Sequence, residues 1–324
     1  MRTSKTALVI GANGGIGREA CLALKRHGWQ VRALARSAPS ERDGMEWVQG
    51  DAMQRADVLA AAQGVDVIVH AVNPPGYRQW DKLVMPMLDN TIAAAKATGA
   101  RIVLPGTIYN YGPDAFPSLR EDSPQHPHTR KGEIRVDMER RLADAAREGV
   151  RTLILRCGDF FGPHPGNNWL SQGLLSIGKP VKTVRYPAEY AHKHAWAYLP
   201  DVAETMVRLL EREHDLKAFD QFHFGGYWLD GHAMTDAIRR AADNSQIALR
   251  RFPWWMISLI APFNETLRET LKMRYLWKTP IQMDDSKLVT FLGGKPYTPL
   301  DEALRTTLVG LGCADIDHAH YKAA

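Results

Sequence analysis

Residues 6–17, TALVIGANGGIG, decide the fold of this chain. The apolar run TALVI has the length of a buried strand, and helical periodicity begins at Ile16. Between them, Gly11 allows a tight turn, Gly14 lets the backbone approach a pyrophosphate, and Gly17 lets the helix pack closely on the strand. Unpaired backbone N–H groups at the helix start then face the phosphate charge. The stretch therefore predicts a strand–turn–helix unit that binds a dinucleotide.

The residue that ends the next predicted strand bears on which dinucleotide is bound. Arg36 lies nineteen residues after Gly17, at the end of the run VRALAR. A site selective for NAD places an Asp or Glu near this position to bind the ribose 2′-hydroxyl, and residues 31–38 contain no acid. A guanidinium there suits a 2′-phosphate, and a solvated arginine at a strand end is the alternative. We therefore expect NADP (NADPH) in preference to NAD.

The first half of the chain alternates apolar runs of strand length with longer segments of helical period. Strands are predicted at residues 7–10, 30–34, 46–48, 65–70, 101–104 and 151–155. Helices are predicted at residues 16–26, 80–97 and 131–147, the last two followed by Gly99 and Gly149 near C-cap positions. This alternation is typical of parallel βαβ units. The expected fold class is therefore α/β, a Rossmann-type doubly wound parallel sheet.

The second half of the chain has a different pattern. Residues 112–130 are rich in Pro and His and indicate a long loop, which in compact domains is usually functional. Beyond Gly162 the pieces become shorter and aromatic-rich, and the C-terminal third is helical with proline breaks. We expect a dinucleotide-binding domain of residues 1–165 plus about 190–226. A smaller, partly helical substrate lobe would comprise about 166–189 plus 227–324.

Composition sets outer limits on function. The chain has 324 residues, and 41 Lys plus Arg against 36 Asp plus Glu give a net charge of +5, too small an excess to indicate nucleic-acid binding. Three cysteines far apart in sequence predict a reducing compartment, with neither a disulfide nor zinc. The N-terminus runs directly into the glycine motif, so no signal peptide is expected. We predict a cytoplasmic protein.

Residues 254–263 form the most apolar segment outside the predicted sheet. They are about half the roughly 20 residues that a spanning helix needs, and Pro253 and Pro262 bracket them. A transmembrane helix is therefore not expected. The segment is interpreted as a pocket lining or an oligomer contact, and an interfacial membrane helix is the less favoured alternative because its basic pattern is irregular.

Six short stretches follow one another in an order known from one superfamily. They are Gly11–Gly17, Gly50-Asp51, His70-Ala71-Val72-Asn73, Leu104-Pro105-Gly106-Thr107-Ile108-Tyr109-Asn110-Tyr111-Gly112, Leu155-Arg156-Cys157-Gly158-Asp159-Phe160-Phe161-Gly162-Pro163 and Tyr198-Leu199-Pro200-Asp201-Val202-Ala203. Together they cover about the first 225 residues. In this series the chain resembles the extended or atypical short-chain dehydrogenase/reductases, which include the NAD-dependent epimerases and dehydratases.

The resemblance implies roles for individual residues. Asp51 would face the adenine, Ala71 would lie along the cofactor, and Thr107 would hydrogen-bond a reacting oxygen. A helix N-cap is the alternative for Asp51, and a hydroxyl satisfied by backbone is the alternative for Thr107. The expected cofactor-binding residues are Gly11, Asn13, Gly14, Gly15, Ile16, Gly17, Arg36, Asp51, Ala52, Ala71, Val72, Asn73 and Cys157.

The sequence departs from this superfamily at the chemistry. Its usual Tyr-x-x-x-Lys pair opens the helix after the long loop, four residues before a Glu that we match to Glu139. That alignment puts Lys131 at the tyrosine position and Arg135 at the lysine position. The usual catalytic pair is therefore absent.

Three interpretations of this departure stay open. Lys131 could be the proton donor, with a pKa lowered by Arg135, which would hold the ribose or nicotinamide. Tyr109 or Tyr111 could supply the phenol from the strand-end loop, with Lys131 binding substrate. The domain could also bind NADP without turnover, as a sensor or partner-binding module. A solvated basic helix start is the simplest alternative for Lys131 and Arg135.

The remaining polar and aromatic residues suggest a substrate pocket without a metal. Five histidines lack accompanying carboxylates at ligand spacing, so no metal is expected. They are His126, His128, His164, His192 and His194. An anion-binding fork with aromatic walls is predicted for the substrate, with core packing as the alternative for the aromatics. Its residues would be Trp169, Arg185, Tyr186 and Trp196.

The predicted activity is NADPH-dependent hydride transfer to or from a carbonyl or conjugated carbonyl of a small molecule. The alternatives are a nucleotide-sugar epimerase or dehydratase, in which the hydride returns to the same substrate, and a non-catalytic NADP-binding sensor. A homodimer is expected from the resemblance only. One Rossmann scaffold hosts many functions, so the fold alone does not choose among them.

Overall fold

The computed structural model describes residues 4–37, 43–74, 79–164, 166 and 168–314. Its centre is a seven-stranded sheet in which every pairing is parallel. The strands lie in the order β3 (Glu46–Gln49), β2 (Gln30–Ala35), β1 (Thr6–Ile10), β4 (Val67–His70), β5 (Arg101–Thr107), β7 (Thr152–Cys157) and β11 (Phe219–Phe224). This is a Rossmann-type doubly wound sheet, so the predicted fold class is confirmed.

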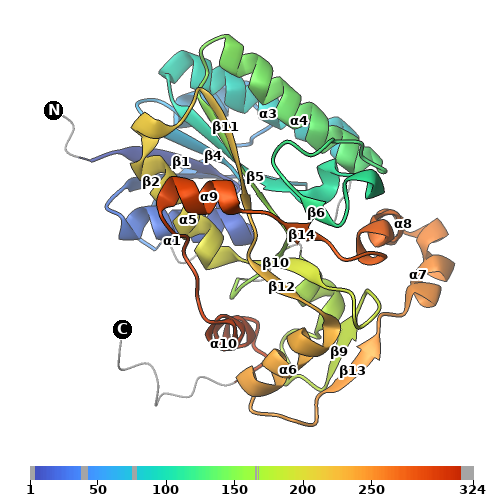
Figure 1. Cartoon of the computed structure of the whole chain (residues 1–324). Coiled ribbons are helices and arrows are strands. Elements are labelled where there is room, and N and C mark those ends of the chain that lie inside the picture. Colours follow the sequence, from blue (N-terminus) through green and yellow to red (C-terminus); the bar gives the residue numbers. More distant parts are fainter. Residues whose placement is uncertain (1–3, 38–42, 75–78, 165, 167, 315–324) are drawn as a thin grey trace.

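Helices cover both faces of this sheet (Figure 1). One face carries α1 (Gly15–Arg26), α5 (Leu199–Glu211) and α9 (Ser286–Leu292). The other carries α2 (Arg55–Ala61), α3 (Trp80–Thr98) and α4 (Arg130–Arg147). The strands of the sheet centre are buried on both faces, which explains why they read as unbroken apolar runs in the sequence.

A second lobe packs below the carboxyl ends of the strands (Figure 1). Its small sheets are β12 (Tyr227–Leu229) with β10 (His194–Tyr198) and β8 (Asp159–Phe161), β13 (Ala248–Arg251) with β9 (Thr183–Tyr186), and β14 (Gln282–Met283) with β6 (Ser118–Leu119). Its helices are α6 (Gly231–Ala241), α7 (Trp254–Ile260), α8 (Glu265–Lys272) and α10 (Leu300–Gly310). The domain limits given above remain a proposal. Helix α9, expected in this lobe, packs against β11 of the main sheet.

The predicted elements are present with small shifts at their ends. Strand β5 extends three residues beyond its predicted end, through Pro105 to Thr107. At Pro105 the strand has passed its last pair with β4 and pairs with β7 alone, so the missing N–H is tolerated there. Gly99 is the C-cap of α3, with φ of 75°. The C-cap of α4 is Glu148, and Gly149, with φ of 95°, follows it. The loop 112–130 contains the short strand β6.

Candidate active site

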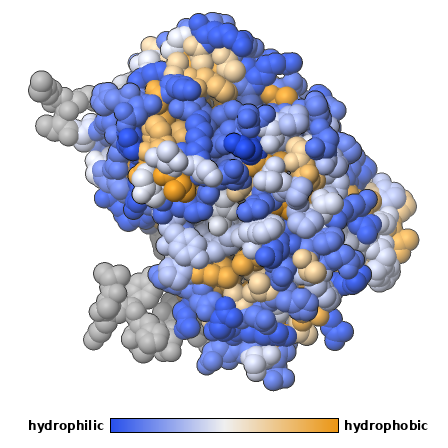
Figure 2. Space-filling view, in the orientation of Figure 1, coloured by the Kyte–Doolittle hydropathy of each residue, from blue (hydrophilic) through white to orange (hydrophobic). Residues whose placement is uncertain are grey.

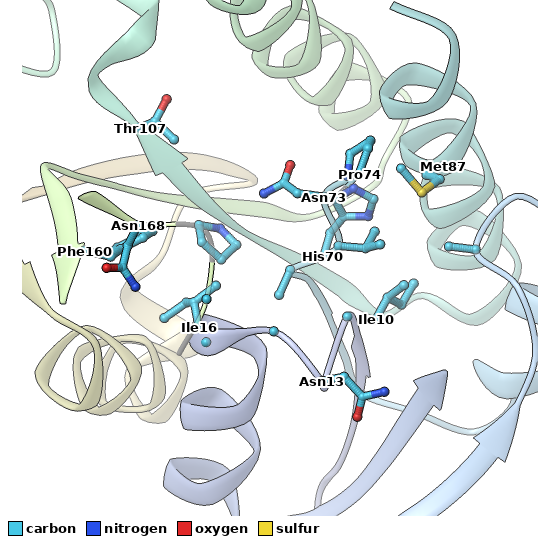
Figure 3. Close-up of a pocket in the computed structure, with 18 of the residues that line it drawn as sticks. Ile10, Asn13, Ile16, His70, Asn73, Pro74, Met87, Thr107, Phe160 and Asn168 are labelled. Atoms are coloured by element: carbon cyan, nitrogen blue, oxygen red, sulfur yellow. The ribbon is translucent and has the colours of Figure 1, made fainter. Parts of the chain in front are cut away.

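A cavity of about 840 Å³ opens where the central strands of the sheet end. Such a volume is in the range of small-molecule and cofactor sites, roughly 300–1,000 Å³. Figure 3 shows Asn13 and Ile10 toward one end and Thr107 with Asn168 toward the other. Most of the expected cofactor residues line it, namely Gly11, Asn13, Gly14, Gly15, Ile16, Arg36, Asp51, Ala52, Ala71, Val72 and Asn73.

Two glycines of the loop, Gly11 and Gly17, leave no room for a side chain. Gly11 has φ of +92°, and a Cβ on it would lie 2.7 Å from the backbone of Ala71 and Val72. A Cβ on Gly17 would lie 2.2 Å from the carbonyl oxygen of Gly11, so Gly17 packs helix on strand and does not line the cavity. Gly14 caps α1 without a side-chain hydrogen bond. The cradle therefore fits a dinucleotide pyrophosphate, held by backbone N–H groups at the start of α1.

Two charged residues lie at the end of the cavity formed by β2 and β3. Arg36, just after β2, is solvent-exposed and lines the cavity. Asp51 is half-buried, and its Oδ1 accepts a hydrogen bond of 2.9 Å from the backbone N–H of Met53. The N-cap of α2 is Gln54, so Asp51 does not occupy the N-cap position. Arg36 and Asp51 are therefore the charged groups available to the adenosine half of a bound dinucleotide.

At the other end, Thr107 and Tyr109 line the cavity beyond the end of β5. The Thr107 hydroxyl accepts a hydrogen bond of 3.2 Å from the Tyr109 backbone N–H, because Thr107 caps the short 3₁₀ turn Ile108–Asn110. Its oxygen thus has a backbone donor, and its own O–H can still donate to a reacting oxygen.

Arg135 reaches this end of the cavity from α4. It is buried, its Nη2 donates a hydrogen bond of 3.0 Å to Asn73 Oδ1, and its guanidinium carbon lies 5.1 Å from the Trp80 ring centre. His70 lines the cavity beside it, with Nδ1 2.8 Å from Thr91 Oγ1. Burial, together with the charge of Arg135, lowers the pKa of His70 to about 3. His70 is therefore neutral at physiological pH, and Arg135 carries the positive charge here.

Lys131 does not line this cavity. Its side chain is buried one helical turn before Arg135, with Nζ 3.4 Å from Glu269 Oε2 of α8 and 5.8 Å from the Trp80 ring centre. Burial lowers the pKa of Lys131 to about 8, and the charge of Glu269 opposes that shift. The alternative of a solvated basic helix start is therefore wrong, and the structure gives Lys131 a carboxylate neighbour that the sequence did not indicate.

Several predicted residues lie away from the cavity, and the expectations for them are corrected. Tyr111 is fully buried, with its hydroxyl 2.8 Å from His223 Nε2 and accepting a hydrogen bond from Arg156 Nη1 at 2.6 Å, and burial raises its pKa. Cys157 is fully buried on β7 and does not line the cavity.

The same holds for the predicted substrate residues. Tyr186 and Trp196 are fully buried in the core of the second lobe, where the Tyr186 hydroxyl donates to the His192 carbonyl. Trp169 packs against Trp277 in that core, with ring centres 5.2 Å apart. Arg185 is exposed on β9. The core alternative is thus correct for the three aromatics, and none of the four lines the cavity.

The residues of the cavity wall that faces the second lobe were not predicted from the sequence. It includes Asp159 of β8, Asn168, and Ser171 and Gln172 of the short π-helical turn Leu170–Leu174. Asp159 Oδ2 lies 2.6 Å from Nε2 of the buried His194. Only Asp159 had a sequence signal, in the quoted stretch 155–163. Among the described residues, no group of three or more His, Cys, Asp or Glu could hold a metal ion.

A parallel sheet with a glycine cradle at its carboxyl edge defines an NAD(P)-binding Rossmann protein, and the comparisons with known proteins give the family. The model of the NAD-dependent epimerase/dehydratase family matches residues 7–225. The chain belongs to this family, which makes it an NAD(P)-dependent enzyme of the extended short-chain dehydrogenase type.

Two curated proteins illustrate the range of activities among its relatives. A 3-diazoavenalumate denitrifying reductase from Streptomyces sp. is 30% identical over 317 residues, which cover 90% of this chain and 96% of that protein. A dTDP-6-deoxy-L-talose 4-dehydrogenase (NAD(P)(+)) from Kitasatospora kifunensis is 28% identical over 176 residues, 50% of this chain and 55% of that protein. One relative is thus named a reductase and the other a dehydrogenase.

Solved structures share the fold at lower identity. UDP-N-acetylglucosamine 4-epimerase from Bacillus cereus matches with a TM-score of 0.74 and 19% identity, covering 97% of this chain and 99% of that chain. UDP-glucose 4-epimerase from Bifidobacterium longum, in complex with NAD+ and UDP, matches with a TM-score of 0.72 and 16% identity, covering 95% and 98%. At these identities the likeness concerns the fold.

Proposed function

We propose that this protein is an NADP(H)-dependent oxidoreductase that transfers a hydride to a carbonyl or conjugated carbonyl of a small molecule. The proposal depends mainly on one observation: a single cavity carries Arg36 at one end and the Thr107, Tyr109 and Arg135 group at the other. Arg36 provides a planar fork for a 2′-phosphate, and residues 31–37 offer no carboxylate for a ribose 2′-hydroxyl. In this preference for NADP the protein would differ from the UDP-glucose 4-epimerase described above, which binds NAD+.

Tyr109 is the proposed proton donor. Of the candidates weighed from the sequence, Tyr109 lines the cavity, whereas Tyr111 and Lys131 are buried elsewhere. Thr107 would donate a hydrogen bond to the reacting oxygen and stabilise the negative charge that develops on it. Arg135, fixed by Asn73, would hold the ribose or nicotinamide. Bound NADPH supplies the hydride.

Net reduction is proposed ahead of epimerisation because the relative that matches over 90% of this chain is named a reductase. Oxidation of an alcohol, the first step of an epimerase, needs a base to take the hydroxyl proton. Tyr109 and Asp159 both line the cavity, and the group that donates a proton in the reduction takes one in the oxidation, so the acids and bases of the cavity serve both directions. The nucleotide-sugar epimerase or dehydratase remains the second candidate, since the family is named for both activities and the neighbours of similar fold are named epimerases.

The test titrates NADPH and NADH into the wild type, Arg36→Ala and a control, Arg55→Ala, whose exposed side chain does not line the cavity. Losing a charge-assisted hydrogen bond should weaken NADPH binding about 10- to 100-fold in Arg36→Ala and leave NADH binding unchanged. Equal affinity of the wild type for the two dinucleotides would contradict the NADP preference.

Turnover is then followed as NADPH oxidation against aldehydes, ketones and enones, with Tyr109→Phe and Lys131→Met as paired variants. We expect Tyr109→Phe to lose at least tenfold in kcat and Lys131→Met to keep most of it. Interconversion of nucleotide sugars without net NADPH consumption would favour the epimerase, and binding without any turnover would favour the sensor. The cytoplasmic location and the homodimer stay predictions.

A further inference from the structure

The apolar segment 254–263 presents a row of exposed hydrophobic side chains. On α7 and the 3₁₀ turn that follows it (Ala261–Phe263), Trp255 is 71% exposed, Leu259 67% and Phe263 91%. Met256 and Ile260 lie between them with 39% and 43% exposed. We call these five residues the apolar tip. Figure 1 shows α7 and α8 projecting from the body, and Figure 2 shows apolar surface at that edge of the molecule.

The proposed enzymatic function does not account for the apolar tip. None of its five residues lines the cavity. The opposite face of α7 is anchored in the core of the second lobe, where Trp254 contacts Phe252 with ring centres 4.8 Å apart. The indole N–H of Trp254 also donates to the Pro187 carbonyl at 2.8 Å. The helix is therefore apolar on both sides: Trp254 and Ile257 are buried, and the apolar tip faces outward.

Exposed basic side chains lie on the elements next to α7 in sequence or packed on it. Four exposed basic side chains come from β13 before α7, from α8, which packs on α7, and from the segment after α8: Arg250, Arg268, Arg274 and Lys278. Arg274 lies with its guanidinium carbon 5.4 Å from the Trp254 ring centre.

The acids of α8 are engaged on its inner side. Glu269 pairs with Lys131 and Lys272, and Glu265 accepts a hydrogen bond from the Gln79 backbone N–H at 3.3 Å. Over residues 250–278 every exposed charged side chain is therefore basic, and one of them, Arg251, pairs with Glu189.

An apolar helix face with Trp and Phe and basic flanks is the combination that binds the interface of an anionic bilayer. A helix of this kind lies in the plane of the interface, with its apolar face buried about 5–10 Å into the boundary between headgroups and acyl chains. A second copy of this chain fits less well, because a symmetric contact would bring the same basic side chains face to face. We propose that the apolar tip inserts into the surface of a membrane containing anionic lipid, so that the protein binds peripherally.

The experiment measures cosedimentation of the full chain with vesicles of phosphatidylcholine alone or with about a third phosphatidylglycerol. The tip variant combines Trp255→Ser, Leu259→Ser and Phe263→Ser. The matched control, Val289→Ser with Tyr297→Ser, removes exposed apolar side chains elsewhere. We expect binding to anionic vesicles that falls at least tenfold in the tip variant and not in the control, since burying one such side chain alone is worth about tenfold.

A charge variant, Arg250→Gln with Arg268→Gln, should weaken binding to anionic vesicles and leave binding to neutral ones unchanged. Wild-type protein that does not bind anionic vesicles, or a tip variant that binds them equally well, overturns the proposal. A wild-type dimer in solution that the tip variant dissociates also overturns it, in favour of a second copy as the occupant.

A second measurement tests the same proposal without the triple tip variant, in case that variant does not fold. Tryptophan fluorescence of the wild type is recorded with anionic vesicles of brominated lipid, and then that of the conservative variant Trp255→Phe. We expect quenching in the wild type that is largely lost in the variant. No quenching, or the same fractional quenching in both proteins, means that Trp255 does not enter the bilayer.

Discussion

Replacement of Lys131 by methionine should remove a pH dependence of stability that the wild type shows above neutrality. Burial lowers the pKa of Lys131 to about 8 in the folded protein, whereas an unfolded lysine titrates at about 10.4. Between these values the unfolded chain binds a proton that the folded protein has released, so the contribution of Lys131 to stability rises with pH. From pH 8 to pH 9.5 this contribution to the free energy of unfolding increases by about 2 kcal/mol, at roughly 1.36 kcal/mol per pH unit.

The assay is urea unfolding of the wild type and Lys131→Met at pH 7 and at pH 9.5. The free energy of unfolding of the wild type, minus that of the variant, should increase by about 2 kcal/mol between the two pH values. Lys179→Met, at a solvent-exposed lysine, is the control, and its difference should be the same at both. An equally constant difference for Lys131→Met would refute the placement of its ammonium group in a buried site beside Glu269.

Three further variants test other parts of the structure. Gly17→Ala would bring a Cβ to 2.2 Å from the Gly11 carbonyl oxygen, so calorimetric titration should show dinucleotide binding lost while a folded protein remains. If the Gly17→Ala variant binds NADPH as tightly as the wild type, the close packing of Gly17 on Gly11 is not needed for dinucleotide binding. Glu139→Gln leaves Arg156, fully buried and held by that carboxylate, without its charge partner. Urea unfolding should show a loss of about 3–5 kcal/mol, and a loss below about 1 kcal/mol would mean that the pair is open to water. Thr107→Ala should lower kcat about 10- to 1,000-fold with little change in NADPH affinity, and an unchanged kcat would remove Thr107 from the site.

The sheet could be predicted from the sequence because its signals are local. An apolar run such as TALVI, the glycines after it and the C-cap at Gly99 each depend on residues within one or two turns. Strand β11, FDQFHF, was not predicted because three of its six residues are polar, although Asp220 and His223 are buried in the structure. The strands of the second lobe were not predicted because they are short and because their aromatic side chains pack against residues far away in the sequence.

In the candidate site, too, some residues could be predicted from local sequence, and others depend on contacts far along the chain. The cradle from Gly11 to Ile16 and the strand-end residue Arg36 lie in one contiguous stretch, so spacing alone brings them to one edge. Lys131 and Tyr109 could not be told apart as proton donors from the sequence. The difference comes from Glu269, on a helix far along the chain, which pairs with Lys131 away from the cavity. Trp169 and Trp196 have the composition of a pocket wall, but their surroundings place them in a core.

The pairing of β6 with β14 has a consequence for the order in which the protein is made. Ser118, in the loop between β5 and α4, pairs with Gln282, and α9 then returns to cover β11. A growing chain on the ribosome therefore cannot complete the first domain until most of the last third has been synthesised. Contacts of such long sequence separation slow folding and leave apolar surface exposed meanwhile. A message truncated before codon 282 should yield a product that proteases and chaperones handle as unfolded, rather than a working nucleotide-binding fragment.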